Sequence, residues 1–294
     1  IVVWDDHESA DDAWAGGAEN HDASTQGPWA DRLAAASRAF REWMPIREGD
    51  EAARIWRRFA FGELLELAML DTRIWGREAQ AESSTDPPAT DPDRQILGED
   101  QERWLLERLR TSEARWKVLG QQVMFAPLRG FPNPDQWDGY PAARERLLAA
   151  VDGDSVDDVV VVTGDIHSSW AFDLPRDPDA YDASTGEGAL AVEVITPAIS
   201  SPGFPEFGAA TIAETLRRDN PHLRWAELTR RGFVVLTFEE ARMQADWFHT
   251  GDVGDEADET LEVAASFATA AGANHLVEAA APAAEAPAAP PLAP

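Results

Sequence analysis

The chain has no cysteine, and Lys117 is the only lysine among its 294 residues. Without cysteine it can form no disulfide and do no thiolate chemistry, so the redox compartment stays open. Basic residues number 25 against 54 acidic ones, which gives a formal net charge of −29 at pH 7. Such a surface repels nucleic acid and anionic membranes, and we expect no nucleic-acid binding. No apolar run is long enough for a membrane-spanning helix.

Hydrophobic residues make up 44% of the chain and include 12 tryptophans, which predicts a folded protein with a substantial core. Apolar runs typical of strands alternate with amphipathic segments typical of helices, so we predict an α/β fold. The simplest reading of the acidity is a solvated surface. An anionic substrate would then need local cations at its site, and bound metal ions could supply them.

One stretch organises the chain, from Val159 to Trp170. Four consecutive valines predict a strand buried on both faces, and Gly164 predicts a sharp turn at its carboxyl end. Asp165 and His167 follow on that turn. Ligand sites in open α/β sheets form at the carboxyl ends of strands, and carboxylate with imidazole suits a metal ion. An isolated Gly-Asp-x-His is also common in ordinary polar turns.

A second cluster of the same kind opens the chain, where Ile1–Trp4 predicts a short core strand and acidic residues and a histidine follow it. If the two strands lie in one sheet, their ends bring five side chains into one crevice. These are Asp5, Asp6, His7, Asp165 and His167.

Six short motifs occur in order: Trp4–Glu8, Met69–Arg73, Trp137–Pro141, Thr163–Trp170, Ile199–Gly203 and Asn220–His222. Together they resemble the PhoD-like alkaline phosphatases, a branch of the calcineurin-like metallophosphoesterases, and the resemblance extends from Ile1 to about Ala270. It implies a metal-dependent phosphomonoesterase or phosphodiesterase that acts on a phosphate ester. The implied fold is a two-sheet sandwich flanked by helices. The family resemblance also suggests an exported protein of the periplasm, cell wall or extracellular space.

The resemblance implies that Asp5, Asp6, Asp165 and His167 bind metal. Asp165 stands where other metallophosphatases have the first histidine of Gly-His-x-His. Oxygen in place of nitrogen favours harder ions over zinc, so the expected cofactors are divalent or trivalent metal ions, with calcium and iron foremost.

Three further residues are candidates for catalysis. His7 matches the histidine that contacts phosphate or protonates the leaving oxygen in the superfamily, and its ordinary pKa suits that role. Arg73 could clamp a phosphate oxygen, or it could form an internal salt bridge with Asp71 or a neighbour. His222 could reach the site, or Asn-Pro-His could simply end a helix.

The opening on an apparent core strand leads us to expect a missing amino-terminal part, because the family's first metal ligand and bridging aspartate lie upstream of Trp4. Residues 1–277 would then form the carboxyl-terminal portion of a metallophosphatase domain that is inactive alone. Two alternatives stay open: a non-catalytic acidic metal-binding remnant, and one half of a split phosphatase. Residues 278–294, rich in alanine and proline, predict a disordered tail.

The remaining elements follow from periodicity. We predict helices over 31–43, 99–109, 141–151, 207–218 and 258–270, and strands over 64–70, 117–125, 189–196 and 233–238, the last paired with 242–248. Residues 9–29, 79–95 and 173–188 predict loops. On the first helix, Leu33, Ala36, Phe40 and Trp43 form the face expected to be buried.

Overall fold

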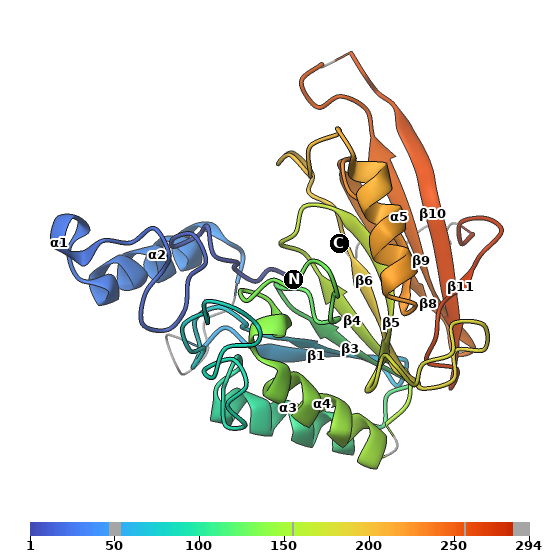
Figure 1. Ribbon diagram of the computed structural model, residues 1–294, viewed down its shortest axis with the longest axis horizontal. Helices are drawn as coiled ribbons and strands as arrows, with labels where there is room; N and C mark the ends of the chain where they lie inside the picture. Colours follow the sequence, from blue (N-terminus) through green and yellow to red (C-terminus); the bar gives the residue numbers. More distant parts are fainter. Residues whose placement is uncertain (47–53, 155, 256, 285–294) are drawn as a thin grey trace, which may run out of the picture.

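The computed structural model describes residues 1–46, 54–154, 156–255 and 257–284. Its strands form a seven-stranded sheet of order β1-β2-β3-β4-β6-β5-β7 and a four-stranded sheet of order β11-β10-β9-β8. The predicted α/β class with two sheets and flanking helices is therefore confirmed (Figure 1).

The first half of the chain contains α1 (Ala23–Gln26), α2 (Trp29–Trp43), β1 (Arg57–Phe61), β2 (Leu65–Met69), α3 (Glu99–Thr111), β3 (Trp116–Gly120), the 3-10 helix η1 (Trp137–Gly139) and α4 (Pro141–Gly153). The second half contains β4 (Val159–Thr163), β5 (Ser169–Pro175), β6 (Ala189–Ile195), α5 (Ala209–Asp219), β7 (Leu223–Glu227), β8 (Gly232–Phe238), β9 (Arg242–Thr250), β10 (Leu261–Ala270) and β11 (Val277–Glu278).

The direction of the strands in the larger sheet fixes where a site can form. Strands β2, β3, β4 and β6 are parallel neighbours. Strand β7 runs in the same direction, because β5 pairs antiparallel with both β6 and β7. The segments that follow β2, β3, β4, β6 and β7 therefore all leave the sheet at one edge, which we call the carboxyl edge.

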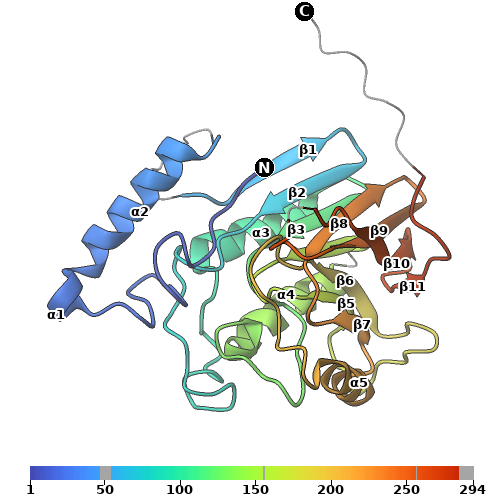
Figure 2. The same ribbon diagram turned by 90° about the horizontal axis from the view of Figure 1, so that it is seen from above.

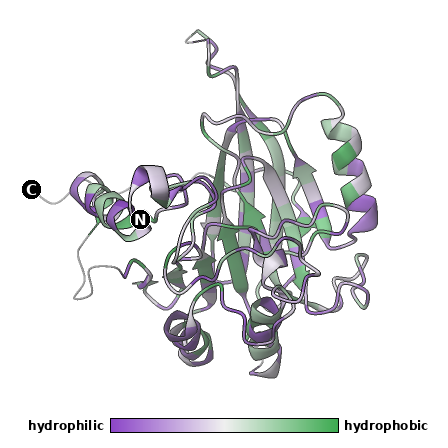
Figure 3. Ribbon diagram, turned by 60° about the vertical axis from the view of Figure 1, so that its left-hand side comes forward, coloured by the Kyte–Doolittle hydropathy of each residue, from purple (hydrophilic) through white to green (hydrophobic). Residues whose placement is uncertain are grey.

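The two faces of the larger sheet pack against different layers (Figure 1). One face packs against α3, α4 and α5, and Val159 and Val161 belong to this core. The other face packs against the smaller sheet, where Val160 meets Trp247 of β9. The four valines thus form a strand buried on both sides, as predicted, and the strands hold the most hydrophobic part of the fold (Figure 3).

The amino-terminal segment is not a strand, and this prediction was wrong. Residues Ile1–Trp4 pair with no neighbouring strand among the described residues. Side chains hold the segment instead: Arg57 donates to the Val2 carbonyl at 2.5 Å, and Gln122 donates to the Trp4 carbonyl at 2.9 Å. The buried Trp4 ring packs on Phe40 of α2. These contacts fix Asp5 and Asp6 without a sheet ladder.

Helix α2 confirms the predicted helix but stands apart from the two sheets (Figure 2). Phe40 is buried, whereas Trp43 is 84% exposed. The expected apolar face is therefore buried only in part, because α2 packs through two small clusters, one with Trp4 and one with Ala13, rather than on the sheet.

Two further predictions failed in the second half of the chain. The alanine-rich segment predicted as a helix over 258–270 contains β10, which pairs antiparallel along β9. Alanine favours helices, but the burial of Phe267 against Trp247 decides the outcome. The loop predicted from residue 173 begins later, because β5 runs to Pro175 with every residue buried.

The strand predicted over 117–125 is shorter than expected, because β3 ends at Gly120. The predicted tail is described only up to Ala284. In that part Ala279 donates to Ser266 and Ala283 donates to Asp246, so it lies against the smaller sheet. Residues 285–294 lie outside the described residues, and their disorder and the domain boundary stay predictions.

Candidate active site

The turn after β4 presents Asp165 and His167 at the carboxyl edge. Gly164 donates to the Gln122 carbonyl at 3.1 Å, which ties the turn to the end of β3. The left-handed conformations fall on Asp165, with φ of 67°, and on His167, with φ of 53°, and not on Gly164 as the sequence suggested. Non-glycine residues in this region are uncommon and cluster at functional sites.

Asp5 and Asp6 reach the same place from the amino-terminal segment. Asp6 is buried, and its carboxylate accepts hydrogen bonds from the backbone N–H groups of His7 at 2.8 Å and Asp12 at 3.0 Å. One carboxylate oxygen from each of Asp5, Asp6 and Asp165 lies within 4.8 Å of the others. The structure thus brings three of the four predicted metal ligands together.

Arg73, which follows β2, lies in the middle of these carboxylates with its side chain fully buried. Its Nε donates to Asp5 at 2.6 Å, its Nη1 donates to Asp135 at 2.6 Å, and its Nη2 donates to Asp165. Of the two readings of Arg73, the structure shows the internal salt bridge. The Arg73 guanidinium does not contact Asp71. The Asp71 carboxylate instead accepts hydrogen bonds from the backbone N–H groups of Arg73, Ile74 and Trp75.

Asp135 and Arg77 belong to the cluster, and sequence reasoning missed both. Arg77 is fully buried and donates to the Asp135 carboxylate at 2.5 Å, so Asp135 links two guanidinium groups. The adjacent Gln136 donates to Asp165 at 3.4 Å. The only local signal is a turn at Asn133-Pro134-Asp135, in which Asn133 accepts the Asp135 N–H, and such turns are common on protein surfaces.

Burial and crowding of carboxylates control the electrostatics. Burial, together with neighbouring carboxylates, raises the pKa of Asp165 to about 7 and also raises the pKa of Asp5, despite the attraction of Arg73. Burial acts against Asp135 as well, but Arg77 and Arg73 outweigh it and lower the pKa of this carboxyl. Burial and nearby aspartates raise the pKa of Asp12 to about 7. Too many acidic groups therefore share too few cations.

The donor set fits a hard cation. Five carboxylates converge here, and only two buried guanidinium groups balance their charge. The carboxylates offer the oxygen ligands that calcium and ferric iron prefer. An added cation would attract the charged forms of Asp5, Asp12 and Asp165, whose pKa values burial and neighbouring carboxylates raise. The carboxylates are those of Asp5, Asp6, Asp12, Asp135 and Asp165, and the guanidinium groups are those of Arg73 and Arg77.

The three predicted histidines lie in different surroundings. His7 has a side chain that is 74% exposed, and its Nε2 lies 3.7 Å from Asp11 and 3.9 Å from Asp6. His167 directs Nδ1 toward the Pro202 carbonyl at 3.3 Å, and within the described ranges it joins neither three-residue group of metal-binding type. His222 is buried, and its Nε2 lies 2.8 Å from the Pro127 carbonyl, so the structure does not bring it into the acidic cluster.

The fold agrees with comparisons to known proteins. Residues 1–247 match the family model described as PhoD-like phosphatase, and the chain belongs to this family. Alkaline phosphatase D of Bacillus subtilis (strain 168) is 34% identical over 263 residues, which are 84% of this chain and 43% of that protein.

A solved structure described as "Structure of PhoD" superposes with a TM-score of 0.84 at 29% identity, over 96% of this chain and 55% of the other. The chain thus spans about half the length of the relatives that it matches. In the part of the chain that the structure describes, every helix is too short or too polar to cross a membrane.

Proposed function

We propose that the protein is a metal-dependent hydrolase of phosphoric esters. The observation that carries this proposal is the convergence of Asp5, Asp6 and Asp165 within 4.8 Å at the carboxyl edge of the parallel strands. Membership of the PhoD-like phosphatase family supports the same reaction class. We propose hydrolysis of phosphomonoesters or phosphodiesters, and we propose that the protein is exported from the cell.

Asp5, Asp6 and Asp165 would hold metal ions. When bound, such ions activate a water molecule and stabilise the charge that develops on the phosphoryl oxygens. His167 suits the role of a further ligand, because an N–H at Nδ1 directed to Pro202 leaves the Nε2 lone pair free.

The other residues act on the substrate and on the cluster. His7 is exposed beside Asp6 and Asp11, so its imidazole is free to contact a phosphate oxygen or to give a proton to the leaving alcohol. Arg73 is fully buried and bonded to three aspartates, so we assign it the role of positioning those carboxylates instead of clamping phosphate. We assign no catalytic role to His222, because its ring is bonded in the core.

The test is a metal-reconstitution assay. The complete parent protein is purified, stripped with a chelator, dialysed against Ca²⁺, Fe³⁺ or Zn²⁺, and assayed with p-nitrophenyl phosphate and bis-p-nitrophenyl phosphate. We expect turnover to disappear on chelation and to return with Ca²⁺ plus Fe³⁺. Asp165→Asn should reduce turnover at least about a hundredfold if it removes a metal ligand. Asp31→Asn, at an exposed position of α2, is the matched control. Turnover that survives both chelation and Asp165→Asn would refute the proposal.

A further inference from the structure

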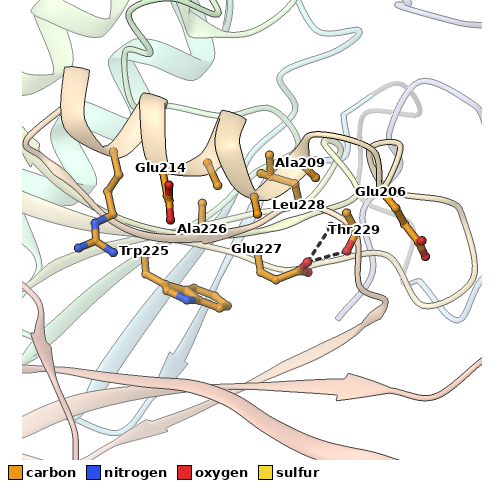
Figure 4. Close-up of a pocket in the computed structure, with 11 residues that line it drawn as sticks. Glu206, Ala209, Glu214, Trp225, Ala226, Glu227, Leu228 and Thr229 are labelled. Carbon is orange, nitrogen blue, oxygen red and sulfur yellow. Dashed lines mark hydrogen bonds between the residues drawn. The ribbon is translucent and has the colours of Figure 1, made fainter.

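A groove of about 510 Å³ runs between helix α5 and strand β7 (Figure 4). Its lining is apolar along the floor, where alanines leave room between the helix and the strand. Charged side chains from the helix and the strand line it as well (Figure 4). Its apolar lining consists of Ala209, Ala210, Ala213, Trp225, Ala226 and Leu228, and its polar lining of Glu206, Glu214, Arg217, Glu227 and Thr229.

One end of this groove lies near the turn that follows β4. Strand β7 ends at the carboxyl edge, and Leu228 directly follows it. Gly203 lies between the two regions: a Cβ placed there would approach the Leu228 carbonyl to 2.5 Å and the His167 carbonyl to 3.0 Å. One glycine backbone therefore separates the groove from His167, which is two residues beyond Asp165.

Exposed aromatic side chains stand at the same end. Phe131 and Phe204 pack with ring centroids 5.7 Å apart, and Phe207 is 99% exposed just before α5. Phe131 lies on the loop that leads to Asp135 of the acidic cluster. Phe204 donates its N–H to Leu228 at 2.9 Å, which ties this aromatic surface to the groove. Aromatic side chains thus lie close to this end of the groove.

The negative charge of the groove lining disfavours anionic ligands. Three glutamates face one arginine, so a second phosphate or another anionic group in the groove would be repelled. Glu227 is already engaged, because it accepts the N–H groups of Thr229 and Arg230. The Thr229 hydroxyl is engaged as well, because it donates to Glu227 at 2.7 Å. An uncharged apolar group fits best.

We propose that this groove binds the organic group of the phosphoester substrate, and that the substrate is the phosphate ester of an apolar, uncharged alcohol. The proposal rests on the proposed phosphoester hydrolysis at the Asp165 cluster. Water replaces the alcohol at phosphorus, so the P–O bond to the alcohol breaks, the alcohol leaves with a proton, and phosphate is released.

The test uses methyl, butyl and hexyl phosphate with the metal-loaded protein and measures released phosphate. These alcohols have similar acidity, so differences in kcat/KM report binding of the chain and not reactivity. An open groove covers about half of each methylene, so we expect kcat/KM to rise about twofold per methylene, and about thirtyfold from methyl to hexyl phosphate.

Variants that fill the groove make the test specific. Ala213→Leu and Ala210→Leu place a large side chain in it, and leucine keeps the helix propensity of alanine. Both should reduce the rise from methyl to hexyl phosphate to less than about fivefold, since fewer methylenes are covered. Thr211→Leu, exposed on the same helix and outside the groove, should keep the full rise. Thermal unfolding checks that each variant is folded. If Ala213→Leu does not fold, Ala210→Leu still tests the groove, because Ala210 is exposed and has room for a larger side chain.

The outcomes separate the two proposals. Hydrolysis of all three esters at equal kcat/KM overturns the groove assignment and leaves phosphoester hydrolysis intact. A rise that both groove variants retain also overturns it. Absence of hydrolysis of every ester, with metal supplied, overturns the proposed function and the substrate class with it.

Discussion

Replacing Arg73 by glutamine would show how far one cation holds the acidic cluster together. The Arg73 side chain is fully buried and contacts Asp5 and Asp135 at 2.6 Å each, and Asp165 as its third partner. Removing one member of a buried ion pair costs about 3–5 kcal/mol, because the charge left behind stays buried. Glutamine keeps some hydrogen bonding but no charge, so at pH 8 without metal we expect a loss in this range.

The loss should depend on pH in a defined direction. In the variant, Asp5 and Asp165 keep raised pKa values without the attraction of Arg73, while the unfolded chain titrates near 3.8. From about pH 4 upward the unfolded state therefore releases protons that the folded state retains, and stability falls as pH rises. At pH 5 the folded variant avoids much of the repulsion by protonation. The difference from the parent should thus be larger at pH 8 than at pH 5.

Urea or thermal unfolding in a chelating buffer at both pH values measures the effect, and added Ca²⁺ should reduce the loss by supplying charge. Arg38→Gln is the matched control, because Arg38 contacts Glu42 at the same 2.6 Å on exposed helix α2, where such a pair contributes about 0.5 kcal/mol or less. If Arg73→Gln costs no more than Arg38→Gln at pH 8 without metal, the cluster is not held by this cation and the reasoning fails.

Three further tests, two of them with a control substitution, address the fold. Burial raises the pKa of Glu193 to about 7, so its contribution to stability should fall by about 3 kcal/mol between pH 4.5 and 7, and Glu193→Gln should remove that slope in pH-dependent urea unfolding. Trp170→Ala should cost about 3–5 kcal/mol because the ring is fully buried, while Trp43→Ala, at 84% exposure, should cost under about 0.5 kcal/mol in the same unfolding assay. Gly139→Ala should lower the melting temperature because its Cβ would overlap the Pro134 carbonyl, whereas Gly153→Ala meets no neighbouring atom within 4 Å and should not.

Much of the central fold could be predicted because its elements carry strong local patterns. Strand β4 follows from four valines, and helix α4 begins at Pro141, where proline suits the first helical position. The convergence of Asp5 and Asp6 with Asp165 was expected, but for a partly wrong reason. The sequence pointed to two adjacent strand ends, whereas Asp5 and Asp6 come from an extended segment held by side chains.

The failures share a physical cause, which is that long-range packing overrides local preference. Strand β10 has alanines that favour a helix, yet pairing with β9 and the contact of Phe267 with Trp247 decide its conformation. Asp135 could not be found from its turn, because its partners Arg73 and Arg77 lie 62 and 58 residues away along the chain. A local sequence pattern cannot predict an ion pair between residues so far apart along the chain.

Two features of the candidate site are unfavourable in free energy, and the buried strand β4 stabilises the turn that carries one of them. Asp165 and His167 both have left-handed backbone conformations, which cost of order 1–3 kcal/mol each, and the cluster holds more carboxylates than cations. The strained turn, which carries Asp165 of the cluster, directly follows β4, the strand buried between two cores. Relaxing the turn would require moving Thr163, whose hydroxyl donates to the buried Glu193 at 2.6 Å. The rigid strand therefore holds acidic side chains in an arrangement that they would not adopt alone, and a bound cation is the partner that would make this arrangement favourable.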